Sequence, residues 1–282
     1  MRHLKTSEAA AMLGVSPDTL RSWERRFGYP RPRRSAGRHR RFVHAEIAAL
    51  RDALHEGLSI SSAISRVREG IPADPDSLMA ALTAFDPARA DAALEAALAL
   101  RSVERAVQEV MLPALVQLGT RAGRGSAAAA LAARWADDWL RRMRRLASPP
   151  RTAGTVLVAD ASGDELEAIH VRVLELFVAR AGLEVIGLPA RATSGLVELI
   201  SARAPDVAVL AGDRLDDEVL ARWAYAARTA GPVRLAAYRS PRARSARPHE
   251  LPSEPLAAAE RLELLAADSA ERAHTQRRAT RG

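Results

Sequence analysis

The sequence predicts a multidomain protein with three folded parts: an N-terminal all-α winged helix-turn-helix, a small helical bundle and a C-terminal α/β doubly wound domain. The first seventy residues place helix signals around a glycine turn and hold 14 basic against 7 acidic residues. Alanine-rich helical segments follow, and from Thr152 short apolar strands alternate with helices, which is typical of a parallel sheet. We place the domains at 1–70, 71–150 and 151–267, and we expect a disordered tail over 268–282.

The basic N-terminal region has the signals of two short helices joined by a tight turn. Thr6 can cap a first helix that ends at Gly14, where glycine accepts a positive φ. Ser16 can cap the second helix, and Pro17 takes its first position, where a missing N–H costs nothing. An arginine-rich loop follows the second helix. This pattern indicates a helix-turn-helix with a basic wing, whose natural partner is DNA.

The candidate contacts to DNA lie on the second helix and on the wing. The helix should enter the major groove, where Arg21 and Arg25 would contact bases or phosphates. Trp23 can pack on the helical core or flank the DNA backbone. The wing should clamp the backbone or the adjacent minor groove. The predicted DNA-binding residues are Arg21, Trp23, Arg25, Arg26, Arg33, Arg38, His39, Arg40 and Arg41.

The rest of the chain separates into helical and mixed segments. Helices are expected near 76–85, 87–100, 103–122 and 126–147, with leucines and Trp135 supplying the core of a bundle. The following strands are expected near 155–162, 183–189, 205–212, 232–238 and 249–252. Helices should separate successive strands, and a last helix is expected over 255–266. Right-handed βαβ units and a parallel sheet follow from this alternation.

A family resemblance rests on the N-terminal residues. The region reads LGVSPDTLRSWERRFG and then PRPRRSAGRHRRF. These segments resemble the winged-helix domain of the MerR family of transcription regulators, and they are most similar to its light- and cobalamin-responsive branch, the CarH, CarA and LitR type. The order of winged helix, bundle and doubly wound domain is also the order in that branch. The resemblance implies a cobalamin-binding-like, flavodoxin- or Rossmann-like third domain.

The ligand motifs of that branch are altered in this chain. The resemblance implies a Trp followed nine residues later by Glu-His in the bundle, and a His and a Gly after the first strand of the sheet. Here Ala122 stands at the Trp position, Ala132 and Ala133 at Glu-His, and Leu166 and Ile169 at the His and the Gly. Leucine has no lone pair for cobalt, and the branched side chain of isoleucine fills space that the nucleotide tail needs. We therefore expect no cofactor, with cobalamin as the alternative.

Other kinds of site have little support. The chain has no cysteine, which excludes disulfides and thiolate metal ligands. It has no phosphate-binding glycine loop and no Ser-His-Asp set, so we predict neither an enzyme, nor catalytic residues, nor a metal site. Asp160 and Asp164 flank the end of the first strand and are the remaining candidates for Mg²⁺. His170 lies one helical turn beyond Leu166 and is poorly placed to replace the lost cobalt ligand.

These observations predict a cytoplasmic, sequence-specific transcription regulator that binds double-stranded DNA as a homodimer or higher homo-oligomer. RNA polymerase is a further candidate partner. Long apolar runs and an apolar signal segment are absent, so we expect no membrane partner. The alternative is a light- or ligand-responsive repressor that still binds cobalamin or another tetrapyrrole in the cleft between bundle and sheet. A third hypothesis is a partner-binding adaptor with a vestigial winged helix, against which the wing arginines argue.

Overall fold

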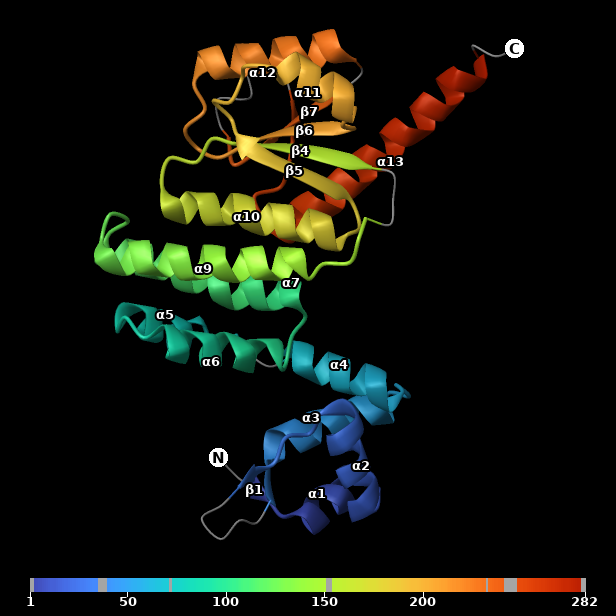
Figure 1. Ribbon diagram of the computed structural model, residues 1–282. Helices are drawn as coiled ribbons and strands as arrows, with labels where there is room; N and C mark the ends of the chain where they lie inside the picture. Colours follow the sequence, from blue (N-terminus) through green and yellow to red (C-terminus); the bar gives the residue numbers. More distant parts are fainter. Residues whose placement is uncertain are drawn as a thin grey trace. The chain divides into compact units, whose positions relative to one another are not determined.

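The computed structural model describes residues 3–34, 40–70, 73–150, 154–231, 233–240 and 248–279. The chain divides into two compact units, each with its own core (Figure 1). The first unit comprises Met1–Ala73 with Ala99–Arg101, and the second comprises Asp74–Leu98 with Ser102–Gly282. Bundle and sheet therefore belong to one unit. Among the described helices, none offers the stretch of apolar residues that a bilayer span would need.

The first unit is helical apart from a small antiparallel sheet. Short strands pair in the order β1 (His3–Leu4), β3 (Arg40–Val43) and β2 (Arg33–Arg34). The described helices are α1 (Thr6–Met12), α2 (Pro17–Phe27), α3 (His44–His55) and α4 (Ile60–Gly70). Leu20, Phe42 and Ile47 are fully buried between them. The predicted helix-turn-helix with a wing is confirmed.

The start of α2 follows the capping signals of the sequence, whereas the start of α1 does not. Ser16 Oγ accepts a hydrogen bond of 3.0 Å from the Thr19 N–H, and Gly14 has a φ of +67°. The predicted cap at Thr6 is wrong. Lys5 occupies the cap position, and its N–H donates to Glu8 Oε2 at 2.6 Å. The side chain of Glu8 thus accepts a hydrogen bond from the backbone N–H of the cap residue, as the glutamate of a capping box does.

The second unit begins with the helical bundle. Its longer helices are α5 (Pro75–Thr83), α6 (Pro87–Leu98), α8 (Leu112–Ala122) and α9 (Ala127–Arg145). The predicted single helix over 103–122 contains a π-helical turn, because α7 (Val103–Ala106) leads through η1 (Val107–Met111) into α8. Pro113 has no N–H for the carbonyl one turn earlier, which accounts for a local change of hydrogen-bond pattern.

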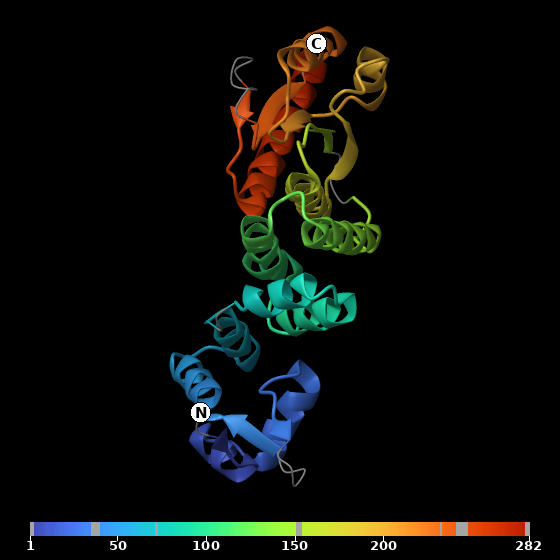
Figure 2. The ribbon, with the colours of Figure 1, turned by 90° about the vertical axis from the view of Figure 1, so that its left-hand side faces the viewer.

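The α/β part is a parallel sheet of the doubly wound type. The order of its strands is β5 (Glu184–Pro189), β4 (Thr155–Asp160), β6 (Val207–Ala211), β7 (Arg234–Tyr238) and β8 (His249–Glu250). Figures 1 and 2 show the layers: α10 (Glu165–Arg180) and α13 (Pro255–Ala279) cover one face, and α11 (Leu196–Arg203) and α12 (Asp217–Ala230) cover the other. The bundle packs through α9 on the outside of α10 (Figure 1).

Helix α13 is longer than predicted. It begins at Pro255 as expected but continues to Ala279, well beyond Ala266, so most of the segment predicted as a disordered tail is helical. Residues 256–279 contain neither glycine nor proline and are rich in alanine, leucine, glutamate and arginine, which favour helix. Polar composition alone was a poor guide to disorder here.

Two glycines of the sheet are required by close packing. Gly187 lies in the middle of β5, where a Cβ would lie 2.1 Å from Glu175 Oε1 of α10. Gly212 follows β6 with a φ of +108°, and a Cβ there would lie 2.6 Å from the backbone of Ala161 and Ser162. The turn after β4 can therefore approach β6 only because residue 212 has no side chain.

The substitution Gly212→Ala should destabilise the second unit by about 1–3 kcal/mol, since it combines a strained φ with a backbone clash. The melting temperature should fall by several degrees in a thermal unfolding experiment on the full chain. Gly125→Ala is the matched control, because nothing lies within 4 Å of a Cβ at that position. Equal melting temperatures for the two variants would contradict the packing described here.

Candidate nucleic-acid interface and regulatory site

The outer face of α2 carries the charged residues of the recognition helix. Asp18, Arg21 and Arg25 are exposed and follow one another at spacings of three and four residues. The opposite face packs on the core through buried Leu20 and through partly buried Trp23 and Phe27. Trp23, named as a candidate DNA contact, thus lies on the core side of the helix. Arg25 and Arg21 are available to a ligand outside the unit.

The wing places Arg40 beside this helix. In register, Arg34 of β2 lies opposite Arg40 of β3, and Arg33 lies opposite Arg41. Arg40 is exposed, and its Nε lies 3.4 Å from Glu24 Oε2 of α2, so strand and helix are joined by an ion pair. Arg41 is half-buried. Arg38 and His39, also predicted to contact DNA, lie outside the described residues.

Two contacts on α2 were not anticipated from the sequence. Asp18 Oδ1 accepts a bond of 2.7 Å from Arg21 Nη1 on the exposed face. The Arg26 guanidinium lies 5.2 Å from the centroid of the Phe27 ring, a cation–π distance. The spacing of three residues between Asp18 and Arg21 was the available signal for the first contact.

Four of the five altered positions of the ligand motifs are buried and apolar, whereas Ala122, at the end of α8, is exposed. Leu166 and Ile169 on α10 are buried, and Ala132 and Ala133 on α9 are buried as well. Leu166 packs on α8 so closely that a Cβ on Gly119 would lie 2.8 Å from Leu166 Cδ1. Helix α10 therefore lies against the bundle where the resemblance implied a ligand.

The space left between α8 and α10 is small. A cavity of about 120 Å³ is lined by Leu112, Leu115, Val116, Gly119, Thr120, Arg124, Leu166 and His170. Sites for small organic ligands usually measure roughly 300–1,000 Å³. No imidazole stands at residue 166 to reach cobalt, and this cavity is too small for a corrin ring. A larger hollow of about 520 Å³ lies between α9 and α10, where Ala133 and Ile169 line it, but it has no imidazole in its lining either. These residues do not fit cobalamin.

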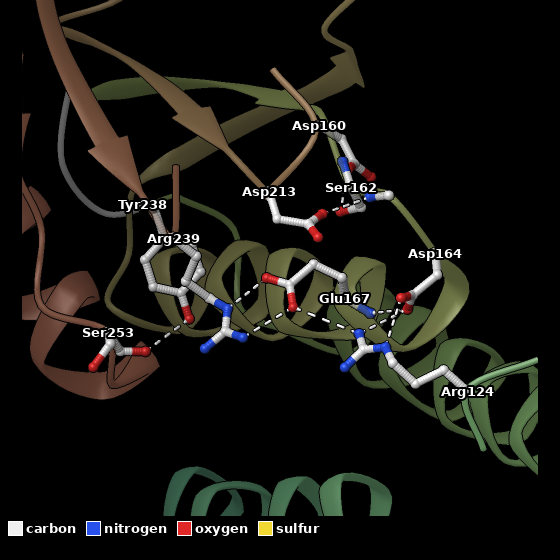
Figure 3. Close-up of polar contacts among 10 residues, drawn as sticks. Arg124, Asp160, Ser162, Asp164, Glu167, Asp213, Tyr238, Arg239 and Ser253 are labelled. Atoms are coloured by element: carbon white, nitrogen blue, oxygen red, sulfur yellow. Dashed lines mark hydrogen bonds and ion pairs between the residues drawn. The ribbon is translucent and has the colours of Figure 1, made fainter. Parts of the chain in front are cut away.

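A chain of ion pairs closes the same region (Figure 3). Arg124, from the turn between α8 and α9, binds Asp164 through two bonds of 2.6 and 2.9 Å. Arg239, which follows β7, binds the buried Glu167 through two bonds of 2.6 and 2.9 Å. Arg124 Nη2 also lies 3.9 Å from Glu167 Oε2. The bundle and two loops of the sheet are thereby joined at the start of α10.

The two aspartates proposed for Mg²⁺ have internal partners. Asp160 Oδ1 accepts bonds from the Ser162 N–H and hydroxyl, and Asp160 Oδ2 lies 3.2 Å from Arg172 Nη2. Asp164 caps α10 by accepting from the Glu167 N–H and also pairs with Arg124, whose hydrogen bond lowers the pKa of Asp164. Within the described part of the chain, His, Asp and Glu residues form no group of three or more that could hold a metal ion.

His170 lies beside the small cavity, one turn beyond Leu166. Burial, and secondarily the charge of Arg239, lowers the pKa of His170 from 6.5 to about 4. Its Nδ1 atom is buried and has no hydrogen-bond partner among the described residues. The folded protein therefore holds this imidazole neutral at physiological pH.

The neutral His170 should make stability depend on pH. Because its pKa is lower in the folded than in the unfolded chain, its penalty is absent above about pH 6.5 and grows as the pH falls towards 4. The free energy of unfolding should fall by about 2–3 kcal/mol from this cause. Urea unfolding from pH 7.5 to pH 4 should show a steeper loss for the wild type than for His170→Gln. Parallel curves would contradict this account.

The fold and the basic face define a class, the helix-turn-helix transcription regulators. The family model described as "MerR family regulatory protein" matches residues 5–42. The HTH-type transcriptional repressor CarA of Myxococcus xanthus is 30% identical over 223 residues, which cover 73% of this chain and 75% of CarA. CarH, a second HTH-type transcriptional repressor of the same organism, is 29% identical over 143 residues, covering 43% of this chain and 48% of CarH. The chain belongs to the MerR family and is homologous to these repressors.

Solved structures with a related fold include corrinoid and cobalamin-binding proteins. The monomethylamine corrinoid protein of Methanosarcina barkeri has a TM-score of 0.48 and 14% identity, covering 67% of this chain and 97% of its own. A cobalamin-binding protein from Desulfitobacterium hafniense DCB-2 has a TM-score of 0.36 and 11% identity, covering 68% of this chain and 98% of its own. Sequence identities and TM-scores as low as these do not indicate that this chain binds the ligand of either protein.

Proposed function

We propose that α2 and the wing of this MerR-family transcription regulator bind double-stranded DNA in a sequence-specific manner, and that its second unit works without cobalamin. The observation that carries the first part is the exposed row of Arg21 and Arg25 on α2, with Arg40 beside it on β3. A helix of this kind enters the major groove with its first turns towards the base edges. Arginines of the wing then meet the phosphates.

The electrostatics of the first unit support this role. Its basic residues outnumber its acidic residues two to one, while the rest of the chain is close to neutral. About six to nine phosphate contacts would release counterions and make affinity fall steeply with salt. Helix-turn-helix proteins commonly bind repeated half-sites as dimers. We propose a homodimer whose contacts lie in the second unit. RNA polymerase and a cytoplasmic location stay predictions.

The second part of the proposal rests on the packing of Leu166 against Gly119 and on the small volume beside them. A ligand in that region would have to displace Leu166 and separate Arg124 from Asp164. In the proposed mechanism, the second unit therefore holds its bundle and sheet together through its own side chains. It serves as a dimerisation or partner-binding module and has no catalytic role.

Replacing Arg21 should weaken DNA binding. In a mobility-shift titration with DNA from the region upstream of its own gene, Arg21→Ala should lower affinity by about 5- to 100-fold, the usual effect of losing a base or phosphate contact. Arg66→Ala is the matched control, because Arg66 is an exposed arginine of α4 that pairs with Glu56. Unchanged binding by Arg21→Ala, or absence of any salt-sensitive shift, would refute the proposed interface.

Cobalamin binding can be tested by spectral titration. Adenosylcobalamin added to the purified full chain in the dark should keep the spectrum of the free compound, because no imidazole stands at residue 166. A cobalamin-binding protein titrated in parallel provides the positive control. A saturable change of spectrum would instead support the light- or ligand-responsive repressor that keeps a tetrapyrrole between bundle and sheet.

A further inference from the structure

We infer that Asp18 is a specificity-determining residue, which together with Arg21 reads a guanine and a neighbouring base that carries an amino group. The inference rests on the proposed DNA-binding function and adds to it the kind of sequence that α2 prefers. It starts from an acidic side chain in the middle of a surface that should face a polyanion.

The structure places Asp18 at the N-terminal end of α2. It is the second residue of the helix, and its side chain is 87% exposed. In helix-turn-helix proteins the first residues of the recognition helix are those that contact base edges. Asp18 shares one face with Arg21 and Arg25, opposite the buried Leu20. A carboxylate at this place will meet the floor of the major groove if α2 enters it.

The chemistry of the groove restricts what Asp18 can contact. Phosphate oxygens repel a carboxylate, and the N7 and carbonyl oxygens of bases are acceptors, as the carboxylate is. The groove offers two donors to it, the N4 amino group of cytosine and the N6 amino group of adenine. A base without such a group would leave one carboxylate oxygen of Asp18 desolvated and without a hydrogen-bond donor. Asp18 therefore discriminates by penalising wrong bases as well as by binding the right one.

The ion pair with Arg21 makes the two side chains act as one reading unit. Arg21 Nη1 donates to Asp18 Oδ1 at 2.7 Å, while Oδ2 has no hydrogen bond within the described residues. Arginine has five N–H groups, so Arg21 keeps donors for the O6 and N7 of guanine. The bond to Asp18 holds a flexible guanidinium in place before DNA arrives, which reduces the entropy lost on binding. Oδ2 remains for the amino group.

The expected sequence element is thus a guanine contacted by Arg21, with cytosine or adenine presented to Asp18 on the same or the adjacent base pair. A carboxylate that finds no donor on the DNA would lower the affinity for every DNA sequence. A carboxylate that accepts from a base amino group lowers the affinity mainly for sequences that lack this amino group. Asp18 contributes selectivity rather than overall strength of binding.

The test is selection of binding sites from a randomised duplex library with the full-length protein. Asp18→Ala should lose the base preference at one or two adjacent positions, a change of about 5- to 100-fold between the best and worst base. Its dependence of affinity on salt should stay close to that of the wild type, because no phosphate contact is removed. Asp18→Asn should shift the preference towards adenine, which asparagine recognises through N6 and N7.

Asp52→Ala is the matched control, because Asp52 is an exposed aspartate of the same unit whose Oδ1 pairs with Arg51 at 2.7 Å. It should select the wild-type sequence. If Asp18→Ala also selects the wild-type sequence with undiminished preference, the inference is wrong. Failure of the wild type to select any sequence would instead refute the proposed DNA-binding function, so the two outcomes are distinguishable.

Discussion

The second unit depends on two carboxylates of α10 that are buried between its neighbours. Glu167 is paired with Arg239, and Glu175 is paired with Arg144 of the bundle at 2.6 Å and with Arg172 at 3.1 Å. Burial raises the pKa of Glu175, and the arginines oppose that rise. A buried carboxylate that loses its partner destabilises a protein strongly, so these pairs allow few other arrangements of bundle and sheet.

These pairs give the unit a way to stay closed without a ligand. Arg124 and Asp164 join the bundle to the start of α10, and Arg144 also donates to the Val185 carbonyl of β5 at 2.7 Å. In a protein that holds a large cofactor between these layers, the cofactor would supply much of the contact. Here Leu166 and the small residue at 119 supply it directly. In the proposed mechanism, the same side chains that close the region take the place of a ligand.

The proposed DNA-binding face would combine attraction to phosphates and discrimination between bases. In the proposed interface, the wing arginines would give affinity that does not depend on sequence, because phosphates are present in every sequence. Selectivity needs groups that distinguish base edges, and in the proposed interface Arg21 and the exposed Asp18 of α2 would supply them. The ion pair between Arg40 and Glu24 joins strand β3 of the wing to α2. In the proposed interface, affinity and sequence preference therefore depend on different side chains.

The sequence alone determined most of the architecture, since its signals are local. Ser16, Pro17 and Gly14 define the turn between the first helices, and the alternation after Thr152 predicts the strands and their parallel direction. Local signals gave wrong predictions for the cap of α1, which is Lys5 and not Thr6, and for the C-terminal end of α13. Only the tertiary structure decided that Leu166 packs on Gly119 and that Arg124 pairs with Asp164, forty residues away. Contacts between distant residues depend on how whole helices pack, and no short pattern encodes that.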